Sequence, residues 1–145
     1  RYFVSPAGPQ QLYAEYFEPP PAPAQRSGET ADAWNAVVQA YQRRNYEQVA
    51  RDLQNLLNDP AFDRPAQGYL YLGVSRLFLG ETAAAADSFQ RIPEASSLNQ
   101  ERTWYLALTY LRAEDTARAE AQLREIAGQA GHYKQEEAQR LLERL

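Results

Sequence analysis

The sequence contains no cysteine and a single histidine, and each scarcity excludes a kind of chemistry. Without cysteine there is no disulfide, no thiol nucleophile and no cysteine-ligated zinc site. With His132 as the single histidine, a metal site built from several histidines of one chain is excluded as well. We therefore expect no metal and no cofactor.

Positive charge and long apolar runs are also missing. The chain has fifteen basic and nineteen acidic residues, which gives a net charge of −4. Because nucleic-acid binding needs a positively charged surface, this balance predicts no nucleic-acid partner. The most apolar run, residues 69–79, is too short to span a membrane and contains Arg76. Methionine is absent, so we expect that the chain does not begin at a translation start.

The overall composition indicates one globular domain, and its N-terminal residues differ from the rest in being rich in proline. The chain has 145 residues, of which 44% are hydrophobic and 23% charged, which suits a single packed core. Six of the nine prolines lie within residues 1–23, and the run of three at 19–21 favours an extended polyproline conformation. The sequence therefore predicts an N-terminal extension over 1–28, with a stiff linker at 18–28.

A short amphipathic helix is predicted between these prolines. Leu12, Tyr13, Tyr16 and Phe17 are spaced for one helical face. Two helical turns are not stable alone in water, so this face needs a partner surface.

From about residue 29 onward the pattern is helical, and no strand is predicted. Apolar residues recur at spacings of three and four, and strong helix formers dominate. The pattern predicts an all-α domain over 29–145 with seven helices, at about 30–43, 46–58, 66–79, 82–91, 98–112, 115–127 and 132–144.

The helical part repeats itself. A shift of 34 residues superposes five positions: Leu72 on Leu106, Gly73 on Ala107, Ala85 on Ala119, Phe89 on Leu123, and Ile92 on Ile126. An earlier copy has the markers Trp34, Val37, Val38 and Tyr41 in its first helix and Val49, Leu53 and Leu56 in its second. The small residues at Gly73 and Ala107 allow two helices to approach closely.

On these residues the chain resembles the tetratricopeptide repeat (TPR) family, whose period is 34 residues with two antiparallel helices per repeat. The resemblance implies an α-solenoid of three helix hairpins, at about 30–60, 66–93 and 98–127, with a capping helix at about 132–144. The first copy departs from the family pattern, because Val38 and Val49 stand where small residues are usual.

The resemblance implies a non-catalytic scaffold or adaptor that binds a protein or peptide in a concave groove. The family's groove-facing positions correspond here to Asn35, Gln39, Gln42, Leu70, Val74, Leu77, Trp104, Leu108 and Leu111. The groove-edge positions correspond to Asp32, Gln67, Glu101, Arg43, Phe78 and Arg112. The Lys, Asn and Arg set with which chaperone-binding members clamp a terminal carboxylate is missing, so that partner class is rejected.

The last six groove-facing residues form an apolar stripe that must be covered. Either the stripe is part of the helical core, or it is a groove for an apolar helix or peptide. Leu12, Tyr13, Tyr16 and Phe17 are the candidate cover. They would dock in this chain's groove or in a second copy's, as a homodimer, and the alternatives are an edge elsewhere on the array or a stalk.

The sequence does not indicate an enzyme. Ser75 has no nucleophile-turn motif around it, and a hydroxyl packed between helices is expected. His132 is expected to be a solvent-exposed residue near a helix start. The acidic pairs at 114–115 and 136–137 also lie beside helix starts, where they favour the helix dipole.

The segment 1–6 looks like a cut after an upstream segment. With residues 12–23 it resembles the region after the membrane anchor of small bacterial TPR proteins of the Bacteroidetes type. That resemblance implies the periplasmic face of the inner membrane, with the cytoplasm as the alternative. The alternative functions are a regulatory extracytoplasmic domain of a membrane-anchored, anti-sigma-like protein, and a self-associating structural module.

Overall fold

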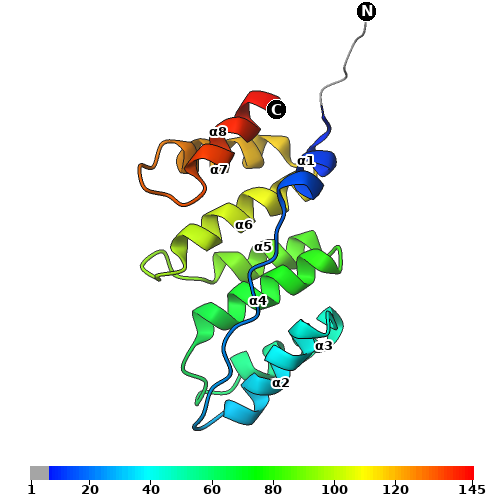
Figure 1. The fold of residues 1–145 in the computed structure, drawn as a ribbon, viewed down its shortest axis with the longest axis vertical. Coiled ribbons are helices and arrows are strands. Elements are labelled where there is room, and N and C mark those ends of the chain that lie inside the picture. The colour runs from blue at the N-terminus through cyan, green and yellow to red at the C-terminus, as the bar shows by residue number, and fades with distance from the viewer. Residues whose placement is uncertain (1–6) are drawn as a thin grey trace, which may run out of the picture. The chain divides into compact units, whose positions relative to one another are not determined.

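The protein is all-helical in the part of the chain that the computed structural model describes, residues 7–145 (Figure 1). Eight α-helices and no strand are present among these residues. The helices are α1 Pro9–Tyr16, α2 Ala31–Gln42, α3 Tyr46–Leu57, α4 Pro65–Phe78, α5 Thr82–Gln90, α6 Asn99–Arg112, α7 Thr116–Ala127 and α8 Gln135–Arg144. The all-helical prediction is confirmed. The segment 1–6, where the sequence suggests a cut, lies outside the described residues.

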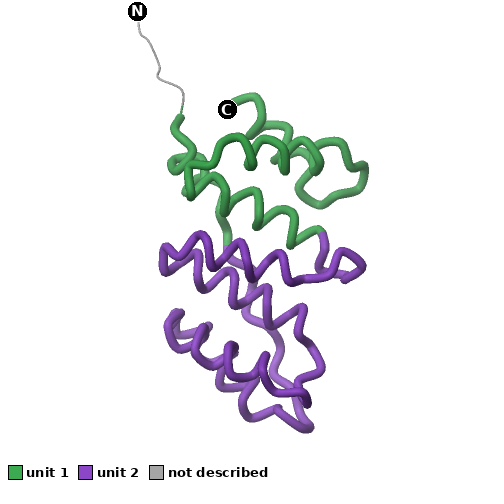
Figure 2. The backbone as a smooth tube through the Cα atoms, turned by 180° about the vertical axis from the view of Figure 1, so that it is seen from behind, with its two compact units in different colours: residues 1–18, 100–145 green, residues 19–99 purple. Residues whose placement is uncertain are grey.

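The chain divides into two compact units (Figure 2). Unit 1 consists of Arg1–Glu18 and Gln100–Leu145, and unit 2 of Pro19–Asn99. The predicted extension over 1–28 is therefore divided: of its described residues, 7–18 belong to unit 1 and 19–28 to unit 2.

Unit 2 is built from α2, α3, α4 and α5, in which each helix packs on the next along the chain. Its core is filled by side chains that the helical periodicity places on inner faces: Trp34, Val38, Val49, Leu53, Leu77 and Phe89. Gly73 of α4 lies where α5 comes closest, because a Cβ atom there would stand 2.5 Å from Cε1 of Phe89. The small residue is thus required by the contact between these two helices.

Unit 1 contains α1, α6, α7 and α8, and α8 packs on α7. Ala119, Leu123, Ala138 and Leu141 bring the apolar faces of α7 and α8 into its core. Leu12 of α1 is completely buried in this unit. The short helix therefore has the partner surface that its length requires.

Three tight turns share one geometry. The turns after α2, α4 and α6 each contain one residue in the left-handed region: Arg44 (φ 59°), Gly80 (φ 77°) and Glu114 (φ 59°). In each turn the next residue donates its N–H, at 2.9 Å, to the carbonyl five residues earlier. This pattern satisfies the free carbonyls at a helix end and reverses the chain within a few residues.

Candidate functional site

In unit 2, residues 19–26 are held through their main chain by side chains of α2 and α4. The segment has no helix or strand; it crosses α4 and continues to the start of α2 (Figure 1). The Tyr41 hydroxyl donates to the carbonyl of Pro20 at 2.6 Å, and the Tyr71 hydroxyl to that of Pro21 at 2.5 Å. Burial raises the pKa of Tyr71 to about 12, so its hydroxyl remains a donor at neutral pH. Proline has no N–H, so its carbonyl oxygen is the main-chain group to which the tyrosine hydroxyls can donate.

Farther along the segment, Asn35 of α2 binds both main-chain groups of Arg26. The Arg26 N–H donates to Oδ1 of Asn35 at 2.8 Å, and Nδ2 of Asn35 donates to the Arg26 carbonyl at 2.9 Å. The indole N–H of Trp34 donates to the carbonyl of Ala24, also at 2.9 Å. A two-point contact to one residue fixes the register and the direction of the segment.

The side chain of Arg26 lies against two aromatic rings. Its guanidinium carbon is 4.6 Å from the ring centroid of Trp34 and 5.7 Å from that of Phe62, and the two rings stack with centroids 5.8 Å apart. Nη1 forms an ion pair with Asp63 at 3.0 Å. Planar guanidinium groups favour such stacking on aromatic faces. We call Trp34, Asn35, Phe62 and Asp63 the arginine site.

Two guanidinium nitrogens of Arg26 are left without a partner. Nε and Nη2 are buried and have no hydrogen-bond partner among residues 7–145. A buried donor that gains no hydrogen bond loses its water without replacement. The arginine site therefore holds Arg26 with part of its hydrogen-bonding capacity unused.

In unit 1, α1 and the two residues after it contact α6. The Tyr105 hydroxyl donates to the carbonyl of Glu18 at 2.8 Å, and the rings of Phe17 and Tyr105 meet edge to face at 6.2 Å. The guanidinium of Arg112 lies 5.2 Å from the ring centroid of Tyr13. Burial raises the pKa of Tyr13, although Arg112 acts in the opposite direction.

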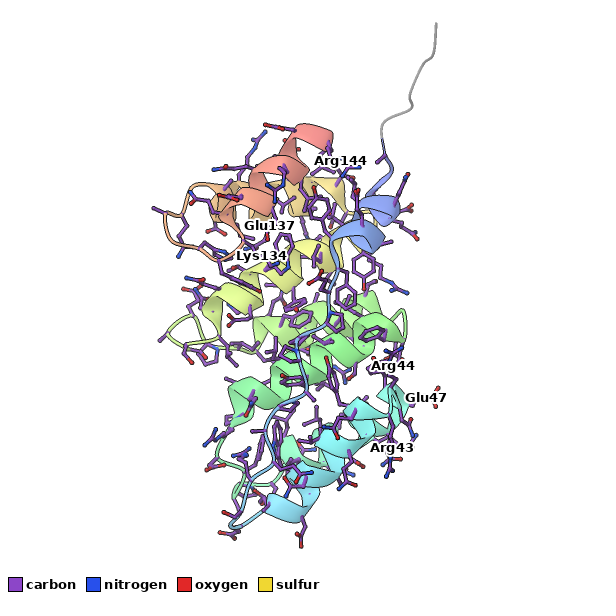
Figure 3. All side chains as sticks on the ribbon, viewed as in Figure 1. Arg43, Arg44, Glu47, Lys134, Glu137 and Arg144 are labelled. Atoms are coloured by element: carbon purple, nitrogen blue, oxygen red, sulfur yellow. The ribbon has the colours of Figure 1, made fainter. Side chains whose placement is uncertain are left out.

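The other end of unit 1 adds a charged contact to α1. Arg144 of α8 forms an ion pair with Glu15 and lies 5.9 Å from the ring centroid of Tyr16. At the start of α8, its N-cap residue Lys134 pairs with Glu137 at 3.1 Å (Figure 3). The four residues predicted to dock are thus at least half-buried within unit 1. Leu12 and Tyr13 are buried, and Tyr16 and Phe17 are half-buried.

The residues predicted to line a groove fall into two groups. The six apolar ones are buried, each with at most 4% of its surface exposed: Leu70, Val74, Leu77, Trp104, Leu108 and Leu111. Among the polar ones, Asn35 is half-buried and binds the segment, whereas Gln39 and Gln42 are exposed. These six residues are therefore covered in this structure, and the hydrogen bonds to residues 19–26 come from Trp34, Asn35, Tyr41 and Tyr71.

Sequence reasoning predicted Asn35 as a binding residue but missed the tyrosine donors and, in the arginine site, Phe62 and Asp63. Tyr71 and Tyr105 are 34 residues apart, so the repeat period itself was the signal that could have found them. Arg26, Phe62 and Asp63 lie outside the helices, where no periodicity marks them.

The expectation that His132 is solvent-exposed is wrong, because only 4% of its surface is exposed. The loop before α8 turns the ring onto α6, where Nε2 lies 2.9 Å from the Thr103 hydroxyl. Nδ1 accepts the N–H of Lys134 at 3.0 Å, and burial lowers the pKa of His132. Ser75, in contrast, is fully buried inside α4, as expected for a hydroxyl packed between helices.

Residues 7–145 contain neither a membrane-spanning helix nor a cluster of metal-ligating side chains. None of their helices combines the length and the apolar character needed to cross a membrane. Within the same residues no group of three or more His, Asp or Glu side chains is placed to hold a metal ion.

Comparison with known proteins gives no relative. No protein-family model, no curated protein and no solved structure matches the chain significantly.

Proposed function

We propose that this protein is a non-catalytic interaction module, a scaffold or adaptor that binds an extended peptide from a protein partner. The observation that carries the proposal is how residues 19–26 are bound in unit 2: Tyr41, Tyr71 and Asn35 all reach main-chain atoms. Side chains that bind the main chain hold a segment in an extended form, whereas pockets for particular side chains supply specificity.

We also propose that the helices form three TPR-type hairpins followed by a capping helix. Two features support this arrangement. The turns at Arg44, Gly80 and Glu114 share one geometry. Gly73 and Ala107, one repeat period apart, are both buried small residues. Two antiparallel helices joined by such a turn are the repeating unit of this family.

The proposal is tested with a library of short unstructured peptides of mixed composition and the full chain labelled with ¹⁵N. We expect bound peptides to shift the amide resonances of α2 and α4 and of residues 19–26, because the peptide displaces the chain's own segment. In a chain whose residues 19–26 are replaced by Gly-Ser repeats, so that the internal segment no longer competes, Tyr71→Phe removes one donor and should weaken binding about two- to tenfold, which corresponds to the net worth of one hydrogen bond.

A matched control is available on the same helix. Tyr69 is half-buried on α4, and none of the contacts to residues 19–26 described above involves it. Tyr69→Phe should therefore leave peptide binding unchanged. Peptides that bind with no resonance shift in α2 and α4, or that bind equally well to the Tyr71→Phe variant, would contradict the proposed function.

A further inference from the structure

We propose that residues 132–134 form a pH-sensitive strap on α6, which detaches from the helix when the ring of His132 takes up a proton. The strap and α6 both belong to unit 1, so this device does not depend on the peptide binding proposed for unit 2. Its opening uncovers one face of α6 in mildly acidic solution.

The strap holds the first half of α6 through three contacts. They pair His132 with Thr103, Tyr133 with Gln100, and Lys134 with Trp104. The first two are polar contacts of 2.9 and 3.0 Å, and the third places the ammonium nitrogen 5.4 Å from the centroid of the indole ring. Residues 100, 103 and 104 share one helical face because they are three and four positions apart. Three successive residues of the strap therefore cover one face of the helix.

The hydrogen bonds around His132 assign the tautomer of its neutral ring. Nδ1 accepts the main-chain N–H of Lys134 at 3.0 Å, so the ring proton resides on Nε2. Nε2 donates to the Thr103 hydroxyl, which in turn donates to the carbonyl of Gln100 at 2.9 Å. Both ring nitrogens are therefore in use, and a further proton can bind only at Nδ1.

Protonation of Nδ1 removes the acceptor that holds the main chain of the strap. The N–H of Lys134 then faces an N–H of the ring, so one hydrogen bond is lost and two donors oppose each other. His132 is almost completely buried, so water cannot replace the lost partner unless the strap moves. Burial lowers the pKa of His132, although the carbonyl of Gln100 acts in the opposite direction. The charged ring therefore favours the detached strap.

The cations near the strap leave no free carboxylate on α8 for a charged ring. Lys134 is itself positive and pairs with Glu137 at 3.1 Å (Figure 3). Arg140 lies 3.8 Å from the same carboxylate. A proton on His132 would thus add a positive charge beside a carboxylate that is already paired twice.

On α6 the charged group near the strap is Glu101, and its titration opposes that of His132. Burial raises the pKa of Tyr133, and the charges of Glu101 and Glu137 raise it further, so Glu101 lies close enough to act on the strap. One carboxylate oxygen of Glu101 is buried without a hydrogen-bond partner among the described residues. Burial raises the pKa of Glu101, so a falling pH neutralises this side chain and favours the closed strap.

The release is local because α8 has its own attachment to α7. Ala138 and Leu141 are buried, and Nε2 of Gln135 donates to the carbonyl of Ala127 at 3.0 Å. The strap itself holds α6 by polar and cation–ring contacts. A segment with few apolar contacts opens at a lower free energy than the whole domain. The strap can therefore leave α6 while α7 and α8 stay folded.

The test uses the full chain labelled with ¹⁵N, titrated from pH 7 to pH 5. At pH 7 the ¹⁵N shifts of the His132 ring should report a proton on Nε2. As the ring becomes charged, the backbone order parameters of residues 132–134 should fall from about 0.85 toward about 0.6, whereas those of α7 should not change. His132→Gln cannot take up the proton, so the order parameters of this variant should not depend on pH over this range.

Three further variants separate the histidine from its neighbours. Glu101→Gln removes the opposing carboxylate and should move the midpoint of strap release to lower pH. Glu136→Gln is the matched control, because that side chain is 82% exposed on α8, and it should leave the midpoint unchanged. Thr103→Val removes the hydroxyl to which the neutral ring donates, so the strap should detach at higher pH. Circular dichroism at pH 7 should show that the helices of each variant are intact.

Four results would overturn the inference. A ring that becomes charged with unchanged order parameters at 132–134 would show that protonation does not release the strap. The same loosening in His132→Gln would assign the pH dependence to another group. An unchanged midpoint in Thr103→Val would show that the hydrogen bond to the ring does not hold the strap. Loss of order in α7 at the same pH would show that the unit unfolds as a whole.

Discussion

The contact of Gly73 with Phe89 provides a quantitative test of the packing in unit 2. A Cβ atom at residue 73 would lie 2.5 Å from Cε1 and 2.7 Å from Cδ1 and Cζ of a fully buried ring. Gly73→Leu adds this atom and three more, and overpacking of this kind destabilises by about 3 kcal/mol. Removal of a helical glycine returns about 1 kcal/mol. The net loss of about 2 kcal/mol should lower Tm by about 4–8 °C for a chain of this length.

The assay is thermal unfolding followed by circular dichroism, with two companion variants. Gly8→Ala is the control, because no atom lies within 4 Å of the Cβ that it adds. Gly73→Ala combined with Phe89→Leu tests the cause directly, since a smaller side chain at residue 89 should relieve the clash. The two changes should then couple by about 1 kcal/mol in a double-mutant cycle. Coincident melts of Gly73→Leu and the parent would refute the reasoning and the helix register behind it.

Three further outcomes are expected. Burial lowers the pKa of His132 from 6.5, so the folded state favours the neutral ring. The contribution of the neutral ring to folding stability is complete above about pH 6.5 and is lost as the pH falls toward the lowered pKa. Urea unfolding at pH 7 and pH 5 should show this loss, and His132→Gln should reduce it. Arg44→Gly should stabilise the protein by up to about 1 kcal/mol in urea titrations, because glycine adopts a positive φ without strain. Burial raises the pKa of Tyr71 from 10.0 to about 12, so its contribution to stability should be lost between those pH values, and Tyr71→Phe should unfold with a smaller change over that range.

The sequence predicts the helices well because their signals are local. Apolar residues at spacings of three and four define a buried face, and the seven predicted helices differ from α2–α8 by at most a few residues at either end. Two helix starts also have local markers, the N-cap residues Asn45 and Asp115. Their side chains accept the N–H groups of Gln48 and Arg118, and both residue types are common at this position in sequences.

The candidate site is predictable only in part, because its contacts join residues far apart in the chain. Tyr71 and Pro21 are separated by 50 residues, and Trp34 is useful as a repeat marker without revealing that its indole N–H binds the carbonyl of Ala24. For His132 the sequence led to a wrong prediction of exposure. Its place in a glycine-containing loop suggests exposure, but the loop folds back and buries the ring against Thr103. Local sequence does not specify which surface a loop returns to.

The prolines of the bound segment also bear on how the protein avoids aggregation. An exposed, extended stretch of chain with free N–H and C=O groups is a template on which another strand can add. Pro19, Pro20, Pro21 and Pro23 have no N–H, so this stretch cannot supply the alternating donors and acceptors that a strand ladder needs. The carbonyls of Pro20 and Pro21 are in addition already bound by tyrosine hydroxyls. Even if it were detached from its helices, a segment of this composition would resist growth into a β-sheet.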